Sequence, residues 1–93
     1  MIRSFRCKET EKLWQGRSSR KFPGDVQDRA LRKLRQLDAA ATMIDLRNPP
    51  SNRLEALKGN RKGQWSIRIN DQWRVCFHWK DGEASEVEIV DYH

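Results

Sequence analysis

The chain has 93 residues, of which 37% are hydrophobic and 34% charged, and this length predicts one domain over residues 1–93 with a modest core. Its 19 Lys and Arg against 13 Asp and Glu give a net charge of +6, which favours nucleic acid as partner and leaves an anionic protein as the alternative. No apolar run approaches the roughly 20 residues of a membrane-spanning helix, and the N-terminus lacks a secretory signal, so we expect a cytoplasmic protein without membrane contact.

The N-terminal third predicts a short strand and a short helix. Residues 2–5 have the composition of a strand, and residues 10–15 that of a helix closed by Gly16, because glycine accepts the left-handed conformation at a helix end. Most of the four Trp and three Phe along the chain are expected to be structural, since a core of this size depends on aromatic burial.

A longer amphipathic helix follows Pro23-Gly24-Asp25, which supplies a breaker and an N-cap. Apolar residues then recur every three or four positions, at Val26, Ala30, Leu34, Leu37 and Ala41. The opposite face is basic, with Arg29, Arg32, Lys33 and Arg35. A solvated helix face is favoured over direct RNA contact for these four residues.

Residues 48–52 form a loop between the helical and sheet portions, because the consecutive Pro49 and Pro50 cannot continue a helix. From Gln64 onward the period changes to two. Alternating residues predict strands from Trp65 to Ile69, from Trp73 to Trp79 and from about Ala84 to the C-terminus, an antiparallel meander packed against the helices. The fold class is therefore α+β.

Alternation places Arg68 and Arg74 on the open face of this sheet, flanking the Asn70-Asp71 turn. Guanidinium groups suit phosphate oxygens and can steady charge that builds on a phosphate during a reaction. Lys58 and the following loop, with Arg61 and Lys62, add positive charge. A phosphate backbone across this surface and a merely soluble sheet face are equally compatible with the pattern.

The last strand ends in Asp91-Tyr92-His93, whose side chains suit proton transfer and base stacking. Val87, Ile89, Asp91 and His93 share one face of a regular strand, and Tyr92 points the other way. The strand must therefore end, twist or bulge near Asp91 for the three side chains to act together. From the pattern alone, a frayed terminus is favoured for His93.

Metal-ligand patterns are absent from the sequence. Cys7 and Cys76 lie far apart and away from any His at ligand spacing, so both are interpreted as reduced packing residues. His78 projects to the face of Arg74 and is interpreted as a structural or surface residue. We expect no metal and no other cofactor.

The segment LEALKGNRKGQWSIRINDQWRV, from Leu54 to Val75, resembles HigB-type toxins of the RelE/ParE superfamily when it is taken with the Asp91-Tyr92-His93 ending and the first five residues. The subgroup that includes GraT is the most similar. The resemblance implies a RelE-like microbial RNase fold, with two N-terminal helices packed on an antiparallel sheet. It also implies the toxin of a type II toxin–antitoxin system, which enters the decoding site of the ribosome and cuts translated mRNA without a metal.

The implied reaction is attack of the ribose 2′-hydroxyl on the adjacent phosphate. In the roles that the resemblance implies, Asp91 and His93 transfer or orient protons, Tyr92 positions a nucleotide, and Arg74 and Lys58 stabilise the phosphate. Arg68 and Gln72 position the RNA. Some HigB toxins carry His at the position of Glu55, so either Glu55 is the base here or His93 takes the whole role.

The resemblance further implies a HigA-type antitoxin with a helix-turn-helix domain, through which alone the toxin would reach operator DNA. Mapped cleavage ends separate this hypothesis from a non-catalytic basic module that occupies the ribosome or only binds the antitoxin. A ParE-like poison of DNA gyrase ranks third, since paired arginines and the terminal His93 suit RNA cleavage better.

Overall fold

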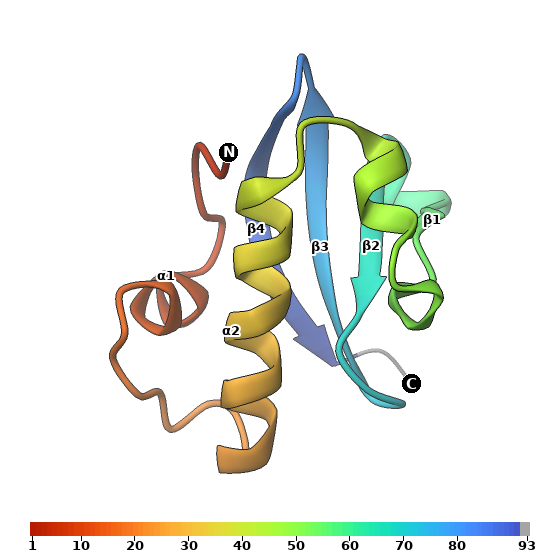
Figure 1. The fold of residues 1–93 in the computed structure, drawn as a ribbon. Helices are drawn as coiled ribbons and strands as arrows, with labels where there is room; N and C mark the ends of the chain where they lie inside the picture. Colours follow the sequence, from red (N-terminus) through yellow and green to blue (C-terminus); the bar gives the residue numbers. More distant parts are fainter. Residues whose placement is uncertain (92–93) are drawn as a thin grey trace.

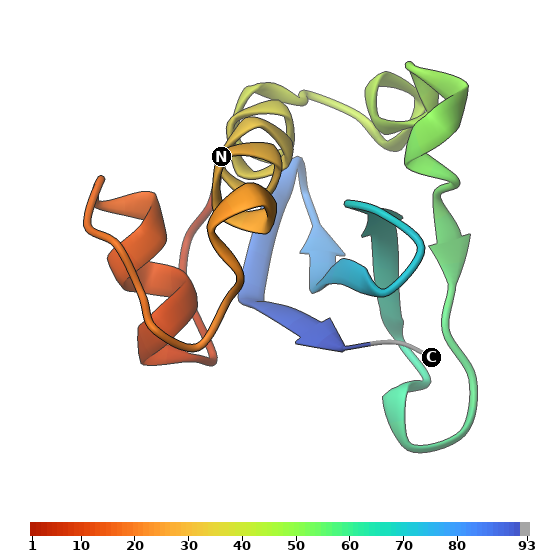
Figure 2. The same ribbon diagram turned by 90° about the horizontal axis from the view of Figure 1, so that it is seen from below.

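A computed structural model describes residues 1–91 of the chain and shows two helices against a four-stranded antiparallel sheet (Figures 1 and 2). The helices are α1 (Lys8–Trp14) and α2 (Gly24–Ala39), and the strands are β1 (Glu55–Ala56), β2 (Gln64–Arg68), β3 (Trp73–Lys80) and β4 (Glu83–Asp91). Helix α2 lies across one face of the sheet, and α1 lies beside α2 at the β4 edge (Figures 1 and 2). Three short 3-10 helices, η1 (Met43–Arg47), η2 (Pro50–Asn52) and η3 (Gly59–Arg61), lie between α2 and β2 in the sequence. The α+β class and the meander are confirmed.

Helix α2 forms where the apolar period predicted it, and its buried residues are Val26, Ala30, Leu34 and Leu37. Each of these leucines, once buried, contributes about 1.5–3 kcal/mol to stability. The predicted N-cap is wrong in detail: Pro23 occupies the cap position without a side-chain hydrogen bond, and Asp25 lies in the first turn. Asp25 therefore interacts with the helix dipole and does not cap a backbone N–H.

The prediction for Ala41 on the buried helix face is also wrong. The helix ends at Ala39, and Ala40 has extended backbone angles. This change of direction buries Ala40 and exposes Ala41. The end of the buried face is thus set by the backbone turn and not by the helical period.

The sheet has strand order β1-β2-β3-β4, with every neighbouring pair antiparallel. Alternation holds through β2 and β3, where Ile67, Val75 and Phe77 are fully buried. In β4 the alternation shifts by one residue at Glu86, which has a φ of +52°, and the register of β3 with β4 shifts at the same level. This bulge allows both Ala84 and Val87 to be buried although they lie three positions apart.

The predicted strand at residues 2–5 is present as two parallel bridges, from Ile2 to Ala84 and from Phe5 to Val87. The backbone N–H of Arg3 donates to the carbonyl of Ala84 over 2.7 Å. The N-terminal segment therefore covers the outer edge of β4 and satisfies backbone groups that would otherwise be exposed there.

Thr10 of α1 continues this edge cover. Its side chain is fully buried, and its Oγ1 accepts a 3.0 Å hydrogen bond from the backbone N–H of Ile89. Substitution Thr10→Val should destabilise the protein by about 1–3 kcal/mol, because it keeps the shape but leaves that N–H without an acceptor. Urea unfolding measures the change. Thr10→Ser is the control, since it keeps the hydroxyl, and an equal loss in both variants would attribute the effect to packing.

The tryptophans and phenylalanines pack in or against the core, as predicted. Phe22 packs edge-on against Trp73, with ring centroids 5.5 Å apart, and Phe77 is fully buried. Trp14, Trp65 and Trp79 are half-buried against the same core. None of the helices within residues 1–91 is long and apolar enough to span a membrane.

Candidate active site

The sheet face opposite α2 carries a layer of polar side chains over a buried floor. The floor includes Ser66 of β2 and Cys76 of β3, both with no exposed surface. They are cross-strand partners in the β2–β3 register. The polypeptide from Arg53 to Gly63, with β1, runs along the edge of β2 beside this face (Figure 2). The face predicted to be open is therefore partly covered.

Arg74 lies at the centre of this layer, and three groups from residues 1–91 lie around its guanidinium. Its Nε donates to Ser66 Oγ over 2.8 Å, and its Nη2 donates to the carbonyl of Arg53 over 2.6 Å. The carboxylate of Glu55 lies 3.8 Å from the same Nη2, and the Arg74 side chain is 12% exposed. The guanidinium is fixed in position before any ligand arrives, as stabilisation of a developing charge requires.

Arg61 forms a second anchored cation on this side of the molecule. Its Nη1 donates to Glu88 Oε1 over 2.6 Å and to Gln64 Oε1 over 3.2 Å. The Glu88 side chain is 15% exposed, and that of Arg61 is 34% exposed. This charged contact ties η3 to β4 and leaves part of the Arg61 side chain at the surface.

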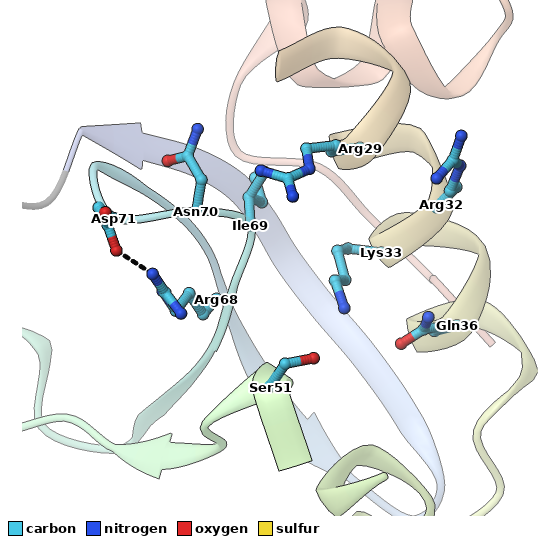
Figure 3. Close-up of a pocket in the computed structure, with 9 residues that line it drawn as sticks. All are labelled: Arg29, Arg32, Lys33, Gln36, Ser51, Arg68, Ile69, Asn70 and Asp71. Atoms are coloured by element: carbon cyan, nitrogen blue, oxygen red, sulfur yellow. Dashed lines mark hydrogen bonds and ion pairs between the residues drawn. The ribbon is translucent and has the colours of Figure 1, made fainter. Parts of the chain in front are cut away.

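Arg68 is the cross-strand partner of Arg74, but its guanidinium has different surroundings. It forms an ion pair with Asp71 in the β2–β3 turn and lines a pocket against α2 (Figure 3). Two like charges that face each other across a strand pair are thus each compensated by a separate carboxylate, Asp71 for Arg68 and Glu55 for Arg74. The predicted pair of arginines is adjacent in the backbone but not joined in one cluster.

The end of β4 lies beside the β2–β3 turn. Gln72 Nε2 donates to Asp91 Oδ2 over 3.0 Å, so two predicted site residues are in direct contact. Asp91 pairs with Trp73, whereas Arg74 pairs with Val90, and alternation therefore assigns Asp91 and Arg74 to opposite faces. Tyr92 and His93 lie outside the described residues.

Within its described part, β4 is interrupted by a bulge well before Asp91. It is at Glu86, and pairing with β3 is regular from Glu88 to Asp91. The condition that Tyr92 joins Asp91 and His93 in one site stays a prediction.

Lys58 and Lys62 flank η3 and are both exposed. Gly59 and Gly63 have φ values of +64° and +95°, which L side chains rarely adopt, so this loop depends on glycine at both ends. The loop presents its two lysines beside the anchored Arg61.

Cys76 and His78 both lie on β3. Burial raises the pKa of the Cys76 thiol to about 11, so this thiol is protonated near neutral pH and is a poor nucleophile. His78 is half-buried and faces Gln64 across the strand pair. Within residues 1–91, no group of three His, Cys, Asp or Glu is arranged to hold a metal ion.

Sequence reasoning missed Ser66 and Glu88, which position Arg74 and Arg61. Strand alternation places both on the same face as Arg74, and this signal could have found them. The contribution of the Arg53 carbonyl depends on a left-handed backbone at a non-glycine residue, with a φ of 44°. No sequence pattern indicates that conformation.

Two solved structures of low identity share this architecture. YafQ from E. coli superposes with a TM-score of 0.60 at 14% identity and covers 98% of this chain and 91% of its own. The YoeB dimer from Staphylococcus aureus gives a TM-score of 0.56 at 21% identity, and the match covers 99% of this chain and 94% of the YoeB chain. The molecule therefore has the fold of the YafQ and YoeB proteins.

Sequence comparison assigns the chain to one family among the proteins with this fold. A family model described as a RelE-like toxin of the type II toxin–antitoxin system HigB matches residues 3–93. The Vibrio cholerae protein Toxin HigB-1 is 44% identical over 85 residues, 90% of each chain. Endoribonuclease HigB of Proteus vulgaris is 33% identical over 93 residues, all of both chains. The chain belongs to the HigB family of RelE-like toxins, as the sequence motifs indicated.

Proposed function

We propose that this HigB-family toxin is a ribosome-dependent mRNA endoribonuclease whose cleavage of translated messages stops growth. The observation that carries the proposal is the match over its whole length to a relative named Endoribonuclease HigB. The anchored Arg74 on the sheet face supports it, because cleavage of a phosphodiester needs a fixed positive charge beside the phosphate.

The proposed reaction is transfer of a phosphodiester bond within the RNA. The ribose 2′-oxygen bonds to the adjacent phosphorus while the bond from phosphorus to the 5′-oxygen breaks. A base takes the proton of the 2′-hydroxyl, and an acid gives a proton to the departing 5′-oxygen. The products are a 2′,3′-cyclic phosphate and a 5′-hydroxyl end, and this reaction needs no metal or other cofactor.

Residue roles follow the family resemblance together with the observed contacts. Asp91 and His93 carry the proton transfers, Tyr92 positions a nucleotide, and Arg74 and Lys58 stabilise the phosphate. Because alternation assigns Asp91 and Arg74 to opposite faces, these roles require the RNA to meet both at the end of β4. Gln72 orients Asp91 through their 3.0 Å hydrogen bond. Arg61, Lys62 and Arg68 bind the RNA on either side of the cut.

Glu55 stands where some relatives have histidine. Its carboxylate lies 3.8 Å from Arg74 Nη2, and its side chain is 49% exposed. We therefore assign it to orienting Arg74 and assign the principal base to the C-terminal residues.

The partners proposed for this toxin are mRNA in the decoding site, the small ribosomal subunit or whole ribosome, and a HigA-type antitoxin with a helix-turn-helix domain. Operator DNA would be contacted through the antitoxin. The chain would act in the cytoplasm as a single domain over residues 1–93. Its net charge of +6 fits an RNA-rich target.

Cleavage in a reconstituted translation system tests the activity. Intact toxin should produce new 5′-hydroxyl ends on mRNA when ribosomes are present and none when they are omitted. His93→Ala should lower the rate by about 100-fold, because proton transfer by a positioned side chain contributes about 10²–10⁴-fold. Sequencing of the 5′ ends measures both. Growth arrest with intact transcripts would contradict the proposal.

A non-catalytic basic module is the second candidate function. The observation in its favour is that both Arg74 and Arg61 have internal partners, as structural arginines do. Such a module would bind ribosomes or antitoxin equally well after His93→Ala and would yield no 5′-hydroxyl ends. The same assay therefore separates the two candidates.

A further inference from the structure

A pocket of about 530 Å³ lies between α2 and the β2–β3 turn, outside the polar layer around Arg74 (Figure 3). The basic face of α2 forms one wall, the turn forms the other, and η2 closes one end. Such a volume is typical of sites for small ligands, which span about 300–1,000 Å³. The residues that line it are Arg29, Arg32, Lys33, Gln36, Ser51, Arg68, Ile69, Asn70 and Asp71.

The pocket concentrates positive charge. Of the described lining residues, four are cationic (Arg29, Arg32, Lys33 and Arg68) and Asp71 alone is acidic. Together they carry a net charge of +3, half the net charge of the chain. Asp71 is paired with Arg68. Among the described residues, Arg29 and Arg32 have no ion-pair or hydrogen-bond partner for their side chains. The α2 side of the pocket therefore lacks a compensating anion.

The pKa of Lys33 responds to its surroundings in the pocket. Burial, and then the neighbouring Arg29, lower the pKa of Lys33. Its Nζ donates to Asn52 Oδ1 over 2.5 Å, and this acceptor is neutral. Cations held near one another without a carboxylate oppose folding, and a bound anion relieves that repulsion.

Phosphate suits this lining better than other ligand groups do. Arginine guanidinium groups match phosphate oxygens in a two-bond geometry. Asn70 uses its Oδ1 to accept from the N–H groups of Gln72 and Trp73, which leaves its amide NH₂ as a donor. Within residues 1–91, the lining contains no aromatic side chain on which a base could stack, and its one apolar residue is Ile69. The chemistry favours a sugar–phosphate backbone over a nucleobase.

We propose that this pocket is a second RNA site, which binds the sugar–phosphate backbone independently of sequence and performs no chemistry. The proposal rests on the ribonuclease function and names a further contact for the same strand. Arg68 lines the pocket and is the cross-strand partner of Arg74, so the pocket adjoins the cleavage site at the edge of β2. One RNA strand can then occupy both, and Arg29 and Arg32 hold it without reading its bases.

Binding of an uncleavable RNA tests the pocket separately from catalysis. The probe is a fluorescent single-stranded RNA of about 12 nucleotides with 2′-O-methyl riboses, followed by anisotropy over a range of salt concentrations. The double variant Arg29→Gln with Arg32→Gln should weaken binding about 10-fold or more. It should also lower the slope of log affinity against log salt by about one to one and a half, since each lost phosphate contact removes about 0.7.

A matched control removes the same charge elsewhere. The double variant Arg35→Gln with Arg47→Gln takes two exposed arginines from α2 and η1 that do not line the pocket. It should weaken binding by no more than about twofold, through the reduced overall charge. Equal weakening by both double variants would overturn the proposal, and so would failure of the intact toxin to bind the probe saturably.

Nitrogen–proton correlation spectra locate the bound RNA. The Nε–H signals of Arg29, Arg32 and Arg68 should move on addition of the probe, equally for uridine and adenosine oligomers. A poly-glutamate peptide that moves these signals while RNA does not would identify a protein carboxylate as the ligand and overturn the RNA assignment.

Failure of this proposal and failure of the proposed function are distinguishable. If the intact toxin cleaves mRNA and the Arg29→Gln with Arg32→Gln variant binds the probe normally, the pocket assignment alone is wrong. If the intact toxin binds the probe through the pocket and produces no 5′-hydroxyl ends, the ribonuclease assignment is wrong and the pocket assignment stands.

Discussion

Replacing Arg74 by alanine is expected to lower mRNA cleavage by about 100-fold or more, the loss seen when one fixed donor to a developing negative charge is removed. The guanidinium is held on Ser66 Oγ and the Arg53 carbonyl at 2.8 and 2.6 Å, beside Glu55, so it needs no rearrangement to meet a phosphate. Cleavage ends in the translation assay give the rate. Arg74→Lys should recover little, because an ammonium group cannot reproduce both hydrogen bonds of the fork.

Arg74 also supports the fold, and a second variant separates the two effects. Arg74→Ala leaves the buried Ser66 hydroxyl without its partner and should lower the free energy of unfolding by about 1–3 kcal/mol. Ser66→Ala removes the same hydrogen bond but keeps the cation, so it should lose similar stability and less than about 10-fold in cleavage. Rates are compared at a temperature where both variants are folded. An equal fall in cleavage in Arg74→Ala and Ser66→Ala would mean that Arg74 acts only by supporting the fold.

Arg47 provides the control for the loss of one positive charge in Arg74→Ala. Arg47 in η1 is exposed and forms no side-chain bond with any residue from 1 to 91. Arg47→Ala should change cleavage by less than about twofold and stability by less than about 0.5 kcal/mol, as is usual for surface substitutions. A larger change would indicate that total charge, and not the position of Arg74, controls the rate.

The helices and the three long strands could be predicted because burial on one side forces a period on the sequence. Leu34 and Leu37 repeat at helical spacing, and Val75 and Phe77 at strand spacing. Strand β1 could not be predicted, since two residues carry no period. The bulge at Glu86 was missed because a non-glycine residue with positive φ has no composition signal.

The residue types of the candidate site were readable from the sequence, but their surroundings were not. Arg74 could be assigned to its sheet face by alternation, whereas its contact with the Arg53 carbonyl joins positions 21 residues apart. The basic face of α2 was interpreted as a solvated surface. In the fold the basic residues of α2 have two different surroundings. Arg29 and Arg32 line the pocket with the β2–β3 turn, and Arg35 does not. Only tertiary structure brings those segments together.

The pocket between α2 and the β2–β3 turn has a structural support in the buried side chain of Asn52. It has no exposed surface, and its Nδ2 donates to Gln36 Oε1 and to the carbonyls of Leu46 and Asn48, over 3.2, 3.1 and 3.3 Å. Its Oδ1 accepts from Lys33 Nζ. One amide therefore fixes α2, η1 and η2 to one another, next to Ser51 at the end of the pocket.

Substitution Asn52→Ala should lower the free energy of unfolding by about 2–4 kcal/mol, because buried groups in a shared network lose their partners together. It should also weaken binding of the uncleavable RNA, since Lys33 and Ser51 lose their positions in the pocket. Urea unfolding and anisotropy measure the two effects. Asn60→Ala is the matched control: Asn60 is exposed in η3 and has no side-chain bond to any described residue, so neither quantity should change. If Asn52→Ala is as stable as Asn60→Ala, the network does not hold the pocket together.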